Sequence, residues 1–463
     1  MCVSKYGTHK FKMKNFNQTK IRFSPDSYVV KRLEQIFVVN QKSGKELLYD
    51  TDSLYWLNKI SYIPQDSIKI VESVKKDYPQ VSTDTIKKDF ESFIKTLKEE
   101  GIVIADNGPA STEEARGIVE SNYLPVLNEI TIELTNICNE RCIHCYLGDN
   151  KFKHIESLSE EQVKGLIYQF VRMGGREITF TGGEIFLYPK LWEVLEYANS
   201  YDIGISLFSN LINLNDEDIR KLKKLHIVDI QTSLYSSVPA IHNRITRIDK
   251  SCEKTVSAIT KLKKNKLPIR IACPIMKENK DSIVELIKFC QNNRILLNID
   301  INIQAQYDGN LSNLSQRLSL EEMESTLADI KKYDKEFCHN YLKRHCFDKN
   351  LKPIEFINQP ICSAGHDNLY ICSNGNIAPC PTLQGYYLGN IKTHSLSEVW
   401  THNKRIKELR NATQTNFPKC LSCELIDYCG RCFAVNFTEQ KNIWEIPEYK
   451  CSIAQIAKKI VEM

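Results

Sequence analysis

Between residues 129 and 303 the sequence alternates short apolar runs with amphipathic stretches. The apolar runs are typical of buried strands, and helical patterns separate most of them. One helix is well marked, because Ser159 and Gln162 form a capping-box pattern directly before the apolar positions Val163, Leu166 and Phe170. Repeated strand and helix units of this kind predict an α/β fold with a parallel sheet. The strands are expected at residues 129–134, 177–180, 204–208, 228–234, 269–272 and 297–303.

Three cysteines follow the first of these strands in a Cys-x3-Cys-x2-Cys run, Cys138, Cys142 and Cys145. A structural zinc site closes with four protein ligands, and a cluster used only for electron transfer commonly takes four cysteines. Three close thiolates therefore indicate a cluster with one iron left open. The alternatives are an incomplete zinc knuckle and accidental clustering.

Polar residues follow the next strands at the points where they end. Gly182, Gly183 and Glu184 come after the second strand, where the glycines allow backbone to approach a ligand closely and the acid can engage a cation. Ser209 and Asn210 come after the third strand, and Ser233 ends the fourth. Each of these serine and asparagine residues could also cap a following helix.

Composition limits the class of protein. The chain has 463 residues, which favours two to three domains. Its 62 basic and 57 acidic residues give a net charge of only +5, so no large cationic surface for nucleic acid is expected. The first residues lack an apolar core region, and no later apolar run is long enough to span a bilayer. A cytoplasmic protein is expected, in which 17 cysteines indicate metal binding rather than disulfides.

Residues 20–106 read as a small unit of their own. Two strand patterns are followed by three helical ones, and the last helix has Ser82 or Thr83 as its cap and Gly101 at its end. Strands first and helices after is a winged-helix-like order. The two strands are expected at 35–39 and 46–49.

From about residue 351 the alternating pattern gives way to closely spaced cysteines. A hairpin is expected around Gly375 and contains Cys372, and two Cys-x2-Cys pairs follow it. Such pairs are a strong metal signal, but seven cysteines exceed what one zinc ribbon needs. These seven are Cys362, Cys380, Cys420, Cys423, Cys429, Cys432 and Cys451. Cys2, Cys252, Cys273, Cys290, Cys338 and Cys346 show no ligand spacing and are interpreted as small core or surface residues.

The cysteine run and the strand order resemble the radical S-adenosylmethionine (SAM) family. This resemblance implies a partial (β/α)6 barrel with its chemistry at the C-terminal ends of the strands. It also implies a [4Fe–4S] cluster on Cys138, Cys142 and Cys145, whose open iron binds SAM and yields a 5′-deoxyadenosyl radical. Relatives often carry an arginine where Thr246 stands, and Arg247 or Arg244 could substitute for it. The implied SAM contacts are Gly182, Gly183, Glu184, Ser209, Asn210, Ser233 and Arg247.

The C-terminal cysteines resemble a SPASM domain, which carries two auxiliary [4Fe–4S] clusters and would bring the total to three. The resemblance assigns one cluster to Cys420, Cys423, Cys429 and Cys451, and the other to Cys362, Cys380 and Cys432. The fourth ligand of the latter is open: either Cys372 closes the cluster, or a free iron binds a substrate thiolate.

The N-terminal unit resembles the PqqD-like domains that bind the leader of a ribosomally made precursor peptide as an added strand. A DNA-binding winged helix and a capping domain without a ligand are the alternatives. Taken together, the three resemblances imply five segments. These are a tail at 1–19, a leader-recognition domain at 20–106, a linker at 107–128, the barrel at 129–350 and the SPASM domain at 351–463.

The whole chain most resembles the sactisynthases, which join a cysteine sulfur to a carbon of the same precursor peptide. An external electron donor is then a further expected partner. Maturases that form carbon–carbon or ether crosslinks, and sulfatase-maturase-like enzymes, remain alternatives. A non-enzymatic zinc-binding regulator is the remote one.

Overall fold

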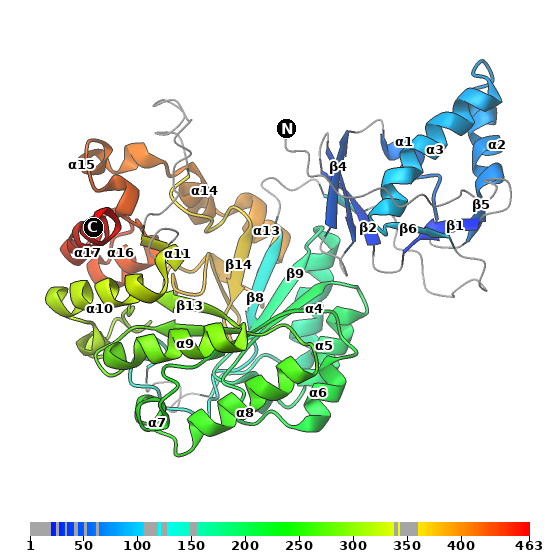
Figure 1. Ribbon diagram of the computed structural model, residues 1–463. Coiled ribbons are helices and arrows are strands. Elements are labelled where there is room, and N and C mark those ends of the chain that lie inside the picture. Colours follow the sequence, from blue (N-terminus) through cyan, green and yellow to red (C-terminus); the bar gives the residue numbers. More distant parts are fainter. Residues whose placement is uncertain are drawn as a thin grey trace. The chain divides into compact units, whose positions relative to one another are not determined.

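The computed structural model divides the chain into two compact units, Met1–Asn122 and Tyr123–Met463 (Figure 1). The expected tail, 1–19, and most of the expected linker lie outside the described residues. The structure describes residues 20–24, 27–32, 35–40, 45–50, 53–61, 64–105, 119–121, 127–148, 155–337, 341–342 and 360–463.

The first unit contains a four-stranded sheet in the order β4-β3-β2-β7. Antiparallel pairing of β3 with β4 confirms the two strands expected from the sequence. A short strand from the region expected to be a linker, β7, pairs in parallel with β2. The outer strand on the other side is β4. The bounds are β2 Ser27–Arg32, β3 Gln35–Asn40, β4 Lys45–Asp50 and β7 Val119–Ser121.

Helices α1 to α3 of the first unit lie where the sequence places them. The Ser82 hydroxyl accepts the Thr85 N–H at 3.1 Å and so caps α3, and Gly101 has a φ of 69° after its end. A second sheet, β5-β1-β6, accompanies them. The bounds are α1 Ser53–Leu57, α2 Ser67–Asp77, α3 Thr83–Glu99, β1 Lys20–Phe23, β5 Gln65–Asp66 and β6 Val103–Ala105.

The second unit is built on six parallel strands that pair in chain order, β8 to β13, as the alternating pattern predicts. Helices α4 to α9 alternate with these strands and α10 follows the last of them (Figure 1). The strands are β8 Glu129–Glu133, β9 Glu177–Thr181, β10 Gly204–Ser209, β11 Ile227–Ser233, β12 Arg270–Pro274 and β13 Leu296–Asp300. The helices are α4 Glu160–Arg172, α5 Leu191–Asn199, α6 Asp216–Leu222, α7 Pro239–Thr246, α8 Ser251–Lys264, α9 Ile283–Asn293 and α10 Leu320–Tyr333.

The same sheet continues into the C-terminal region. Strand β14 (Asn368–Ile371) pairs in parallel with β8, and β15 (Asn376–Ala378) and β16 (Gly389–Asn390) extend the sheet to nine strands. The expected hairpin is therefore present, with Gly375 at a φ of 86° in its turn. The sequence pattern did not predict that β14 adds to the barrel sheet, because no helical crossover pattern leads into it.

The strands and helices of the barrel pack around an extensive apolar core, and smaller apolar clusters lie beside it in the described residues. Ile130 and Ile132 of β8, Phe170 of α4 and Phe180 of β9 are all fully buried in it. The capping box at Ser159 is confirmed, with both reciprocal hydrogen bonds formed. The C-terminal helices are α13 Leu396–His402, α14 Lys404–Asn411, α15 Pro418–Leu421, α16 Phe433–Gln440 and α17 Glu448–Glu462.

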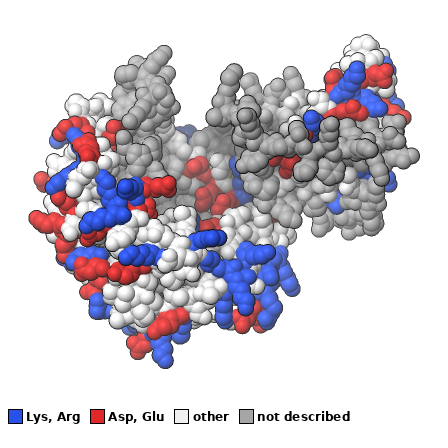
Figure 2. All heavy atoms as spheres, in the orientation of Figure 1, with Lys and Arg blue, Asp and Glu red and all other residues white. Residues whose placement is uncertain are grey.

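Among the helices of the described part, none combines the length and apolarity needed to cross a bilayer. Figure 2 shows acidic and basic side chains intermixed on the visible face, with basic ones gathered over α6 and α8. The last turns of these two helices carry Arg220, Lys221, Lys261, Lys263 and Lys264.

Candidate functional site

The loop after β8 carries Cys138, Cys142 and Cys145, here called the barrel set, and all three are half-buried. Backbone bonds fix this loop to the end of α7. The N–H of Arg141 donates to the carbonyl of Thr246 at 3.0 Å, and the N–H of Ile143 donates to that of Ile245 at 3.1 Å. The loop is thus held by main-chain atoms of a helix about a hundred residues later in the chain.

Polar groups surround the sulfur of Cys142. Its thiol donates to a carboxylate oxygen of Glu140 at 3.2 Å, and the Tyr235 hydroxyl donates to its sulfur at 3.7 Å. Burial raises the pKa of the Cys142 thiol, and the nearby Glu140 and Cys145 raise it further. The thiol is therefore neutral in the metal-free protein, and binding of cationic iron would displace its proton.

The turn Gly182–Glu184 after β9 lies directly against the cysteine loop. The N–H of Gly183 donates to the Thr135 carbonyl at 2.7 Å, and the N–H of Glu184 donates to the Ile137 carbonyl at 2.8 Å. A Cβ on Gly182 would lie 2.5 Å from the Thr135 oxygen, and one on Gly183 would overlap Ile137. These glycines are therefore required where two loops of the protein touch.

Glu184 gathers two of the other predicted site residues. Only 1% of it is exposed, and its carboxylate accepts the Ser209 hydroxyl at 2.7 Å and the Asn210 and Phe186 N–H groups at 2.7 and 3.0 Å. Burial raises the pKa of Glu184, and these three donors oppose that shift. The structure thus brings Glu184, Ser209 and Asn210 together. The Glu184 carboxylate accepts hydrogen bonds from groups of the protein itself.

Asn139 links this group back to the cysteine loop. Its side-chain oxygen accepts the Asn210 amide at 2.6 Å. Its own amide nitrogen is buried and has no hydrogen-bond partner in the described structure. A buried donor left over beside three cysteines fits a bound group with acceptor oxygens, such as the carboxylate of SAM.

The remaining predicted contacts are placed differently. Ser233 ends β11, and its side chain acts to lower the pKa of the Tyr235 phenol, which reaches Cys142. Arg247 is exposed at the end of α7 with a φ of 57°. Arg244 pairs with Glu278 at 2.6 Å. The structure therefore connects Ser233 to the barrel set and leaves both arginines on the surface.

Tyr235 and its neighbours carry no signal in the sequence. The Tyr235 N–H donates to Nδ1 of His242 at 3.1 Å, and the two rings stack with centroids 5.3 Å apart. His144, in the cysteine loop, meets the Tyr235 ring edge-on at 4.7 Å. Burial lowers the pKa of His242 to about 4, so this ring is neutral and supports Tyr235. The contact between His144 and Tyr235 joins residues far apart in the chain and leaves no spacing pattern.

Glu133, at the end of β8, is a second residue that the sequence pattern did not single out. It is 3% exposed, and its carboxylate accepts the Tyr370 hydroxyl at 2.9 Å and the Ser373 hydroxyl at 3.1 Å. Burial raises the pKa of Glu133 to about 7. An acidic residue at the C-terminal end of a buried strand is the only mark that could have pointed to it.

Cys362, Cys380 and Cys432, here called the first auxiliary set, lie close enough to influence one another. Burial raises the pKa of Cys362 to about 12, and Cys380 and Cys432 add to the shift. Cys372 lies elsewhere: it is 3% exposed, packs with Tyr370, and has Glu133 and Glu156 as its charged neighbours.

The second auxiliary set consists of Cys420, Cys423, Cys429 and Cys451. Burial raises the pKa of Cys420 and of Cys429, and other cysteines of the set contribute in both cases. In the described residues, no three histidine, cysteine or acidic side chains are grouped as ligands of one metal ion. The ligands of a [4Fe–4S] cluster bind separate irons, so wider groups suit it. Cys252, Cys273 and Cys290 are core residues, and Cys2, Cys338 and Cys346 lie outside the described residues.

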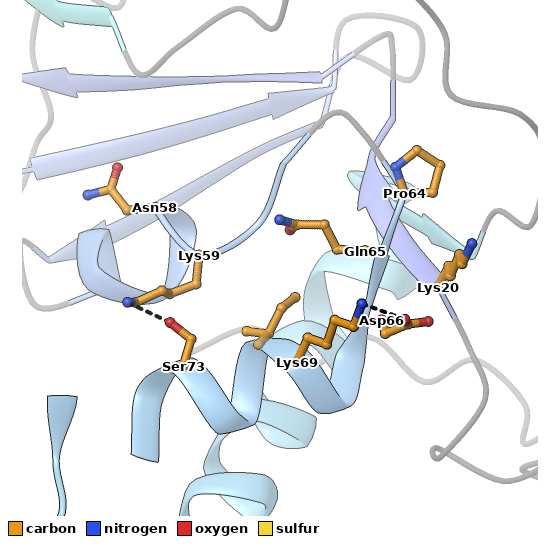
Figure 3. Close-up of a pocket in the computed structure, with 9 residues that line it drawn as sticks. Lys20, Asn58, Lys59, Pro64, Gln65, Asp66, Lys69 and Ser73 are labelled. Atoms are coloured by element: carbon orange, nitrogen blue, oxygen red, sulfur yellow. Dashed lines mark hydrogen bonds and ion pairs between the residues drawn. The ribbon is translucent and has the colours of Figure 1, made fainter. Parts of the chain in front are cut away.

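The first unit contains a polar cavity of about 420 Å³. Lys20, Lys59, Lys69 and Asp66 are among the residues of its wall (Figure 3). Lys59 donates to the Ser73 hydroxyl at 3.2 Å. With three lysines and one aspartate, the wall favours an anionic group.

Family models match both parts of the second unit. Residues 132–290 match the radical SAM superfamily, and residues 362–424 match SPASM, an iron–sulfur cluster-binding domain. The chain carries a radical SAM domain followed by a SPASM domain. The radical SAM match contains the barrel set and the Gly182–Glu184 turn, and the SPASM match begins at Cys362 and ends just after Cys423.

Curated relatives share about a quarter of the residues. The sporulation killing factor maturation protein SkfB of Bacillus subtilis is 25% identical over 285 residues, which cover 60% of this chain and 65% of SkfB. An AdoMet-dependent heme synthase of Oleidesulfovibrio alaskensis is 23% identical over a match that covers 68% of this chain and 84% of the synthase. The antilisterial bacteriocin subtilosin biosynthesis protein AlbA of B. subtilis is 24% identical and covers 69% and 70%.

Solved structures share the fold of the radical SAM and SPASM domains. Streptococcus suis SuiB bound to precursor peptide SuiA has a TM-score of 0.63 at 15% identity and covers 94% of this chain and 100% of SuiB. Native anSMEcpe with bound AdoMet has a TM-score of 0.57 at 16% identity, and the match covers 72% of this chain and 97% of anSMEcpe. At these identities the likeness establishes the fold alone.

Proposed function

We propose that this protein is a radical SAM enzyme that forms thioether links between cysteine sulfur and carbon in a ribosomally made precursor peptide. The observation that carries the proposal is the contact between the loop of the barrel set and the Gly182–Glu184 turn, in one unit that also contains both auxiliary sets. Relatives named as maturation and bacteriocin biosynthesis proteins support a peptide substrate.

The barrel set would hold a [4Fe–4S] cluster with one iron open to SAM. When bound and reduced, this pair supplies a 5′-deoxyadenosyl radical that takes a hydrogen atom from a peptide carbon. The Ile245 and Thr246 carbonyls fix the cysteine loop, and Tyr235 donates a hydrogen bond to a ligand sulfur. Hydrogen bonds to cluster sulfurs tune such centres, so Tyr235 is a residue that adjusts the cluster.

The SAM contacts are proposed to come from the group around Glu184. Its buried carboxylate fixes Ser209 and Asn210, and Asn139 keeps one amide donor for a ligand oxygen. Gly182 and Gly183 contribute by letting their turn lie against the cysteine loop. Ser233 belongs to this site through Tyr235, whereas Arg247 reaches it only if its exposed side chain moves.

The two auxiliary sets would each hold a further [4Fe–4S] cluster, which makes three in all. The first set offers three cysteines, and Cys372 faces Glu133 and Tyr370 in the described structure. We therefore infer an iron of the first auxiliary cluster that is open to a thiolate of the peptide. A thiolate bound there would already be deprotonated and ready to meet the carbon radical.

Peptide recognition is proposed for residues 20–106, as in PqqD-like domains. In the described residues β4 is an outer strand of its sheet, and Leu48 on it is 57% exposed. An outer strand offers main-chain donors and acceptors to an added strand, and an exposed leucine offers apolar contact. Leader binding there would raise the local concentration of the core peptide at the barrel. A cytoplasmic setting with an external electron donor and without nucleic acid completes the proposal.

A second candidate is a maturase of the same fold that makes carbon–carbon or ether crosslinks. Cofactors and cysteine sets would be the same, and only the fate of the peptide cysteine differs. The heme synthases among the relatives add a non-peptide substrate as a further possibility, and β4 with its exposed Leu48 favours the peptide.

The test has two stages, both anaerobic and both with reconstituted full-length protein. The first measures 5′-deoxyadenosine formed from SAM and reductant, with Cys142→Ala expected to abolish it. Cys252→Ala, a core cysteine 1% exposed, is the matched control and should retain it. Deoxyadenosine formation by Cys142→Ala would disprove the assignment of the barrel set.

The second stage takes fragment masses of a cysteine-containing precursor peptide after reaction and thiol alkylation. Loss of a hydrogen pair per link, with cysteines protected from alkylation, would establish thioether formation. The same mass loss with every cysteine alkylated would instead establish a carbon–carbon or ether crosslink.

A further inference from the structure

Tyr307 contacts both the cysteine loop of the barrel and the peptide that follows Cys380. It lies in the segment after β13, and it is half-buried. Its N–H donates to the carbonyl of Tyr146 at 3.1 Å, and the two rings meet with centroids 4.9 Å apart and planes inclined by 48°. Its hydroxyl donates to the carbonyl of Pro381 at 2.8 Å. One side chain therefore joins two loops that are far apart in the sequence.

The covalent neighbours of these contacts are ligand cysteines. Tyr146 directly follows Cys145 of the barrel set, and Pro381 directly follows Cys380 of the first auxiliary set. The path from one cysteine to the other thus consists of covalent bonds, one contact between Tyr146 and Tyr307, and one hydrogen bond from Tyr307. Both non-covalent steps have ordinary hydrogen-bond or aromatic-pair geometry.

The segment that carries Tyr307 is fixed against the cysteine loop at a second point. Asn313 is 3% exposed, and its amide donates to the carbonyl of His144 at 3.2 Å and to that of Gln304 at 2.7 Å. A buried amide that satisfies two carbonyls in this way holds its surroundings in place. Tyr307 is therefore part of a built connection between the two loops.

We propose that Tyr307, with Tyr146, is the electron-transfer connection between the barrel set and the first auxiliary set. The inference rests on the proposed function, in which both sets hold clusters. When a thiolate joins a carbon radical, one electron is left over and reduces the auxiliary cluster. That electron passes along the Tyr307 path, so the auxiliary cluster is oxidised again and the cluster of the barrel set is reduced. The transfer itself makes and breaks no bond and moves no proton.

The balance of the whole cycle supports such a return path. Cleavage of SAM takes one electron from the cluster of the barrel set, and closure of the thioether releases one. Returning it through Tyr307 makes the external donor necessary for the first turnover and not for each later one. Electron tunnelling weakens much faster across gaps than through bonds, and the Tyr307 hydroxyl closes the gap to Pro381.

The experiment follows one electron inside the reconstituted full-length protein. Oxidised protein is mixed with less than one equivalent of reductant, frozen at increasing times and measured by electron paramagnetic resonance. The cluster of the barrel set is recognised because SAM changes its signal. Tyr307→Phe removes the bond to Pro381 and keeps the ring, and Tyr307→Leu removes both. Tyr386→Phe is the matched control, because this C-terminal tyrosine donates instead to Glu408 at 2.6 Å.

In the wild type and in Tyr386→Phe, the electron should be distributed between the clusters at the first time point. In Tyr307→Phe the distribution should change slowly over the series, and in Tyr307→Leu more slowly still, at unchanged iron content. Equal distribution kinetics in Tyr307→Phe and the wild type, with all clusters present, would overturn the inference. If the leucine variant loses its clusters, the phenylalanine variant decides alone. A wild type without clusters would instead refute the proposed function.

Discussion

The hydroxyl of Tyr370 donates to the carboxylate of Glu133 at 2.9 Å, although the two residues are 237 positions apart. Glu133 ends the first strand of the barrel, and Tyr370 lies on the strand from the C-terminal region that pairs beside it. This buried bond joins the radical SAM and SPASM domains at the end of the sheet where the cysteine loop begins.

Glu133 should make stability depend on pH. Burial raises its pKa from 4.5 to about 7 in the folded state, so the folded protein binds the proton more tightly than the unfolded chain does. The contribution of proton binding at Glu133 to the free energy of unfolding is fully present below pH 4.5 and is lost as pH rises to about 7. A shift of this size corresponds to at most about 3 kcal/mol of unfolding free energy.

The measurement is the midpoint of unfolding of the wild type and of Glu133→Gln over this pH range. The difference between the two unfolding midpoints should change with pH. Glutamine does not titrate, and the titration of all other groups affects both proteins equally. A constant difference across the range would contradict the buried, proton-binding carboxyl.

Gly183→Ala should damage the site through the backbone. The added methyl group would overlap the Ile137 carbonyl in the cysteine loop, and we expect a cost of roughly 1–3 kcal/mol from overpacking. Gly165→Ala is the control, because nothing lies near a Cβ there and alanine favours a helix by about 0.5–1 kcal/mol. Denaturant unfolding should therefore show opposite signs for the two variants. If both are stabilised, the two loops are not in close contact.

Glu184→Gln should destabilise the protein and weaken SAM binding together. Glutamine offers one acceptor oxygen where Ser209, Asn210 and Phe186 now donate to two, so at least one buried donor loses its partner. The expected cost is about 1–3 kcal/mol. Glu217→Gln, at a side chain 64% exposed, should change neither property. Equilibrium binding of SAM to reconstituted protein and unfolding curves test both, and a fully stable Glu184→Gln would show that the carboxylate is not the organising acceptor.

Leu48→Asp should weaken binding of a precursor peptide without affecting SAM cleavage. The leucine is 57% exposed on the outer strand β4, and a charge there would repel apolar side chains of an added strand. Leu296→Asp, at a leucine 64% exposed on β13, is matched in residue type and exposure. Fluorescence anisotropy of a labelled peptide should separate the two variants. Equal affinities would place the leader elsewhere, and the cavity beside Lys20 and Lys59 would then be tested next.

The regular parts of the fold follow from local signals in the sequence. The capping pattern at Ser159 and the periodicity after it predict α4, and the alternating apolar runs predict the six parallel strands. The Cys-x3-Cys-x2-Cys run and the two Cys-x2-Cys pairs are local signals too, since their spacing lies within short segments. The division of the C-terminal cysteines into two sets is instead implied by the resemblance to a SPASM domain. Gly182 and Gly183 were expected to let a ligand approach, and in the structure they let the cysteine loop approach.

Contacts between distant segments could not be predicted in the same way. The carbonyl of Thr246 accepts the main-chain N–H of Arg141, and every residue type except proline has such a donor. The hydroxyl of Tyr235 reaches Cys142 only because two loops meet in space. Pairing of β14 with β8 likewise depends on where the chain returns, and no periodicity of the sequence records it.

That pairing has a consequence for how the protein can be divided. Strand β8 has β9 on one side and β14 on the other, so the described sheet runs without a break through both domains. A fragment ending before residue 360 would lack β14 and leave the main-chain donors and acceptors on that edge of β8 unpaired. Unpaired strand edges tend to pair with other chains and cause aggregation. The two domains named from sequence families therefore share one sheet. Separating them would remove the pairing of β8 with β14 and leave each domain with an open strand edge.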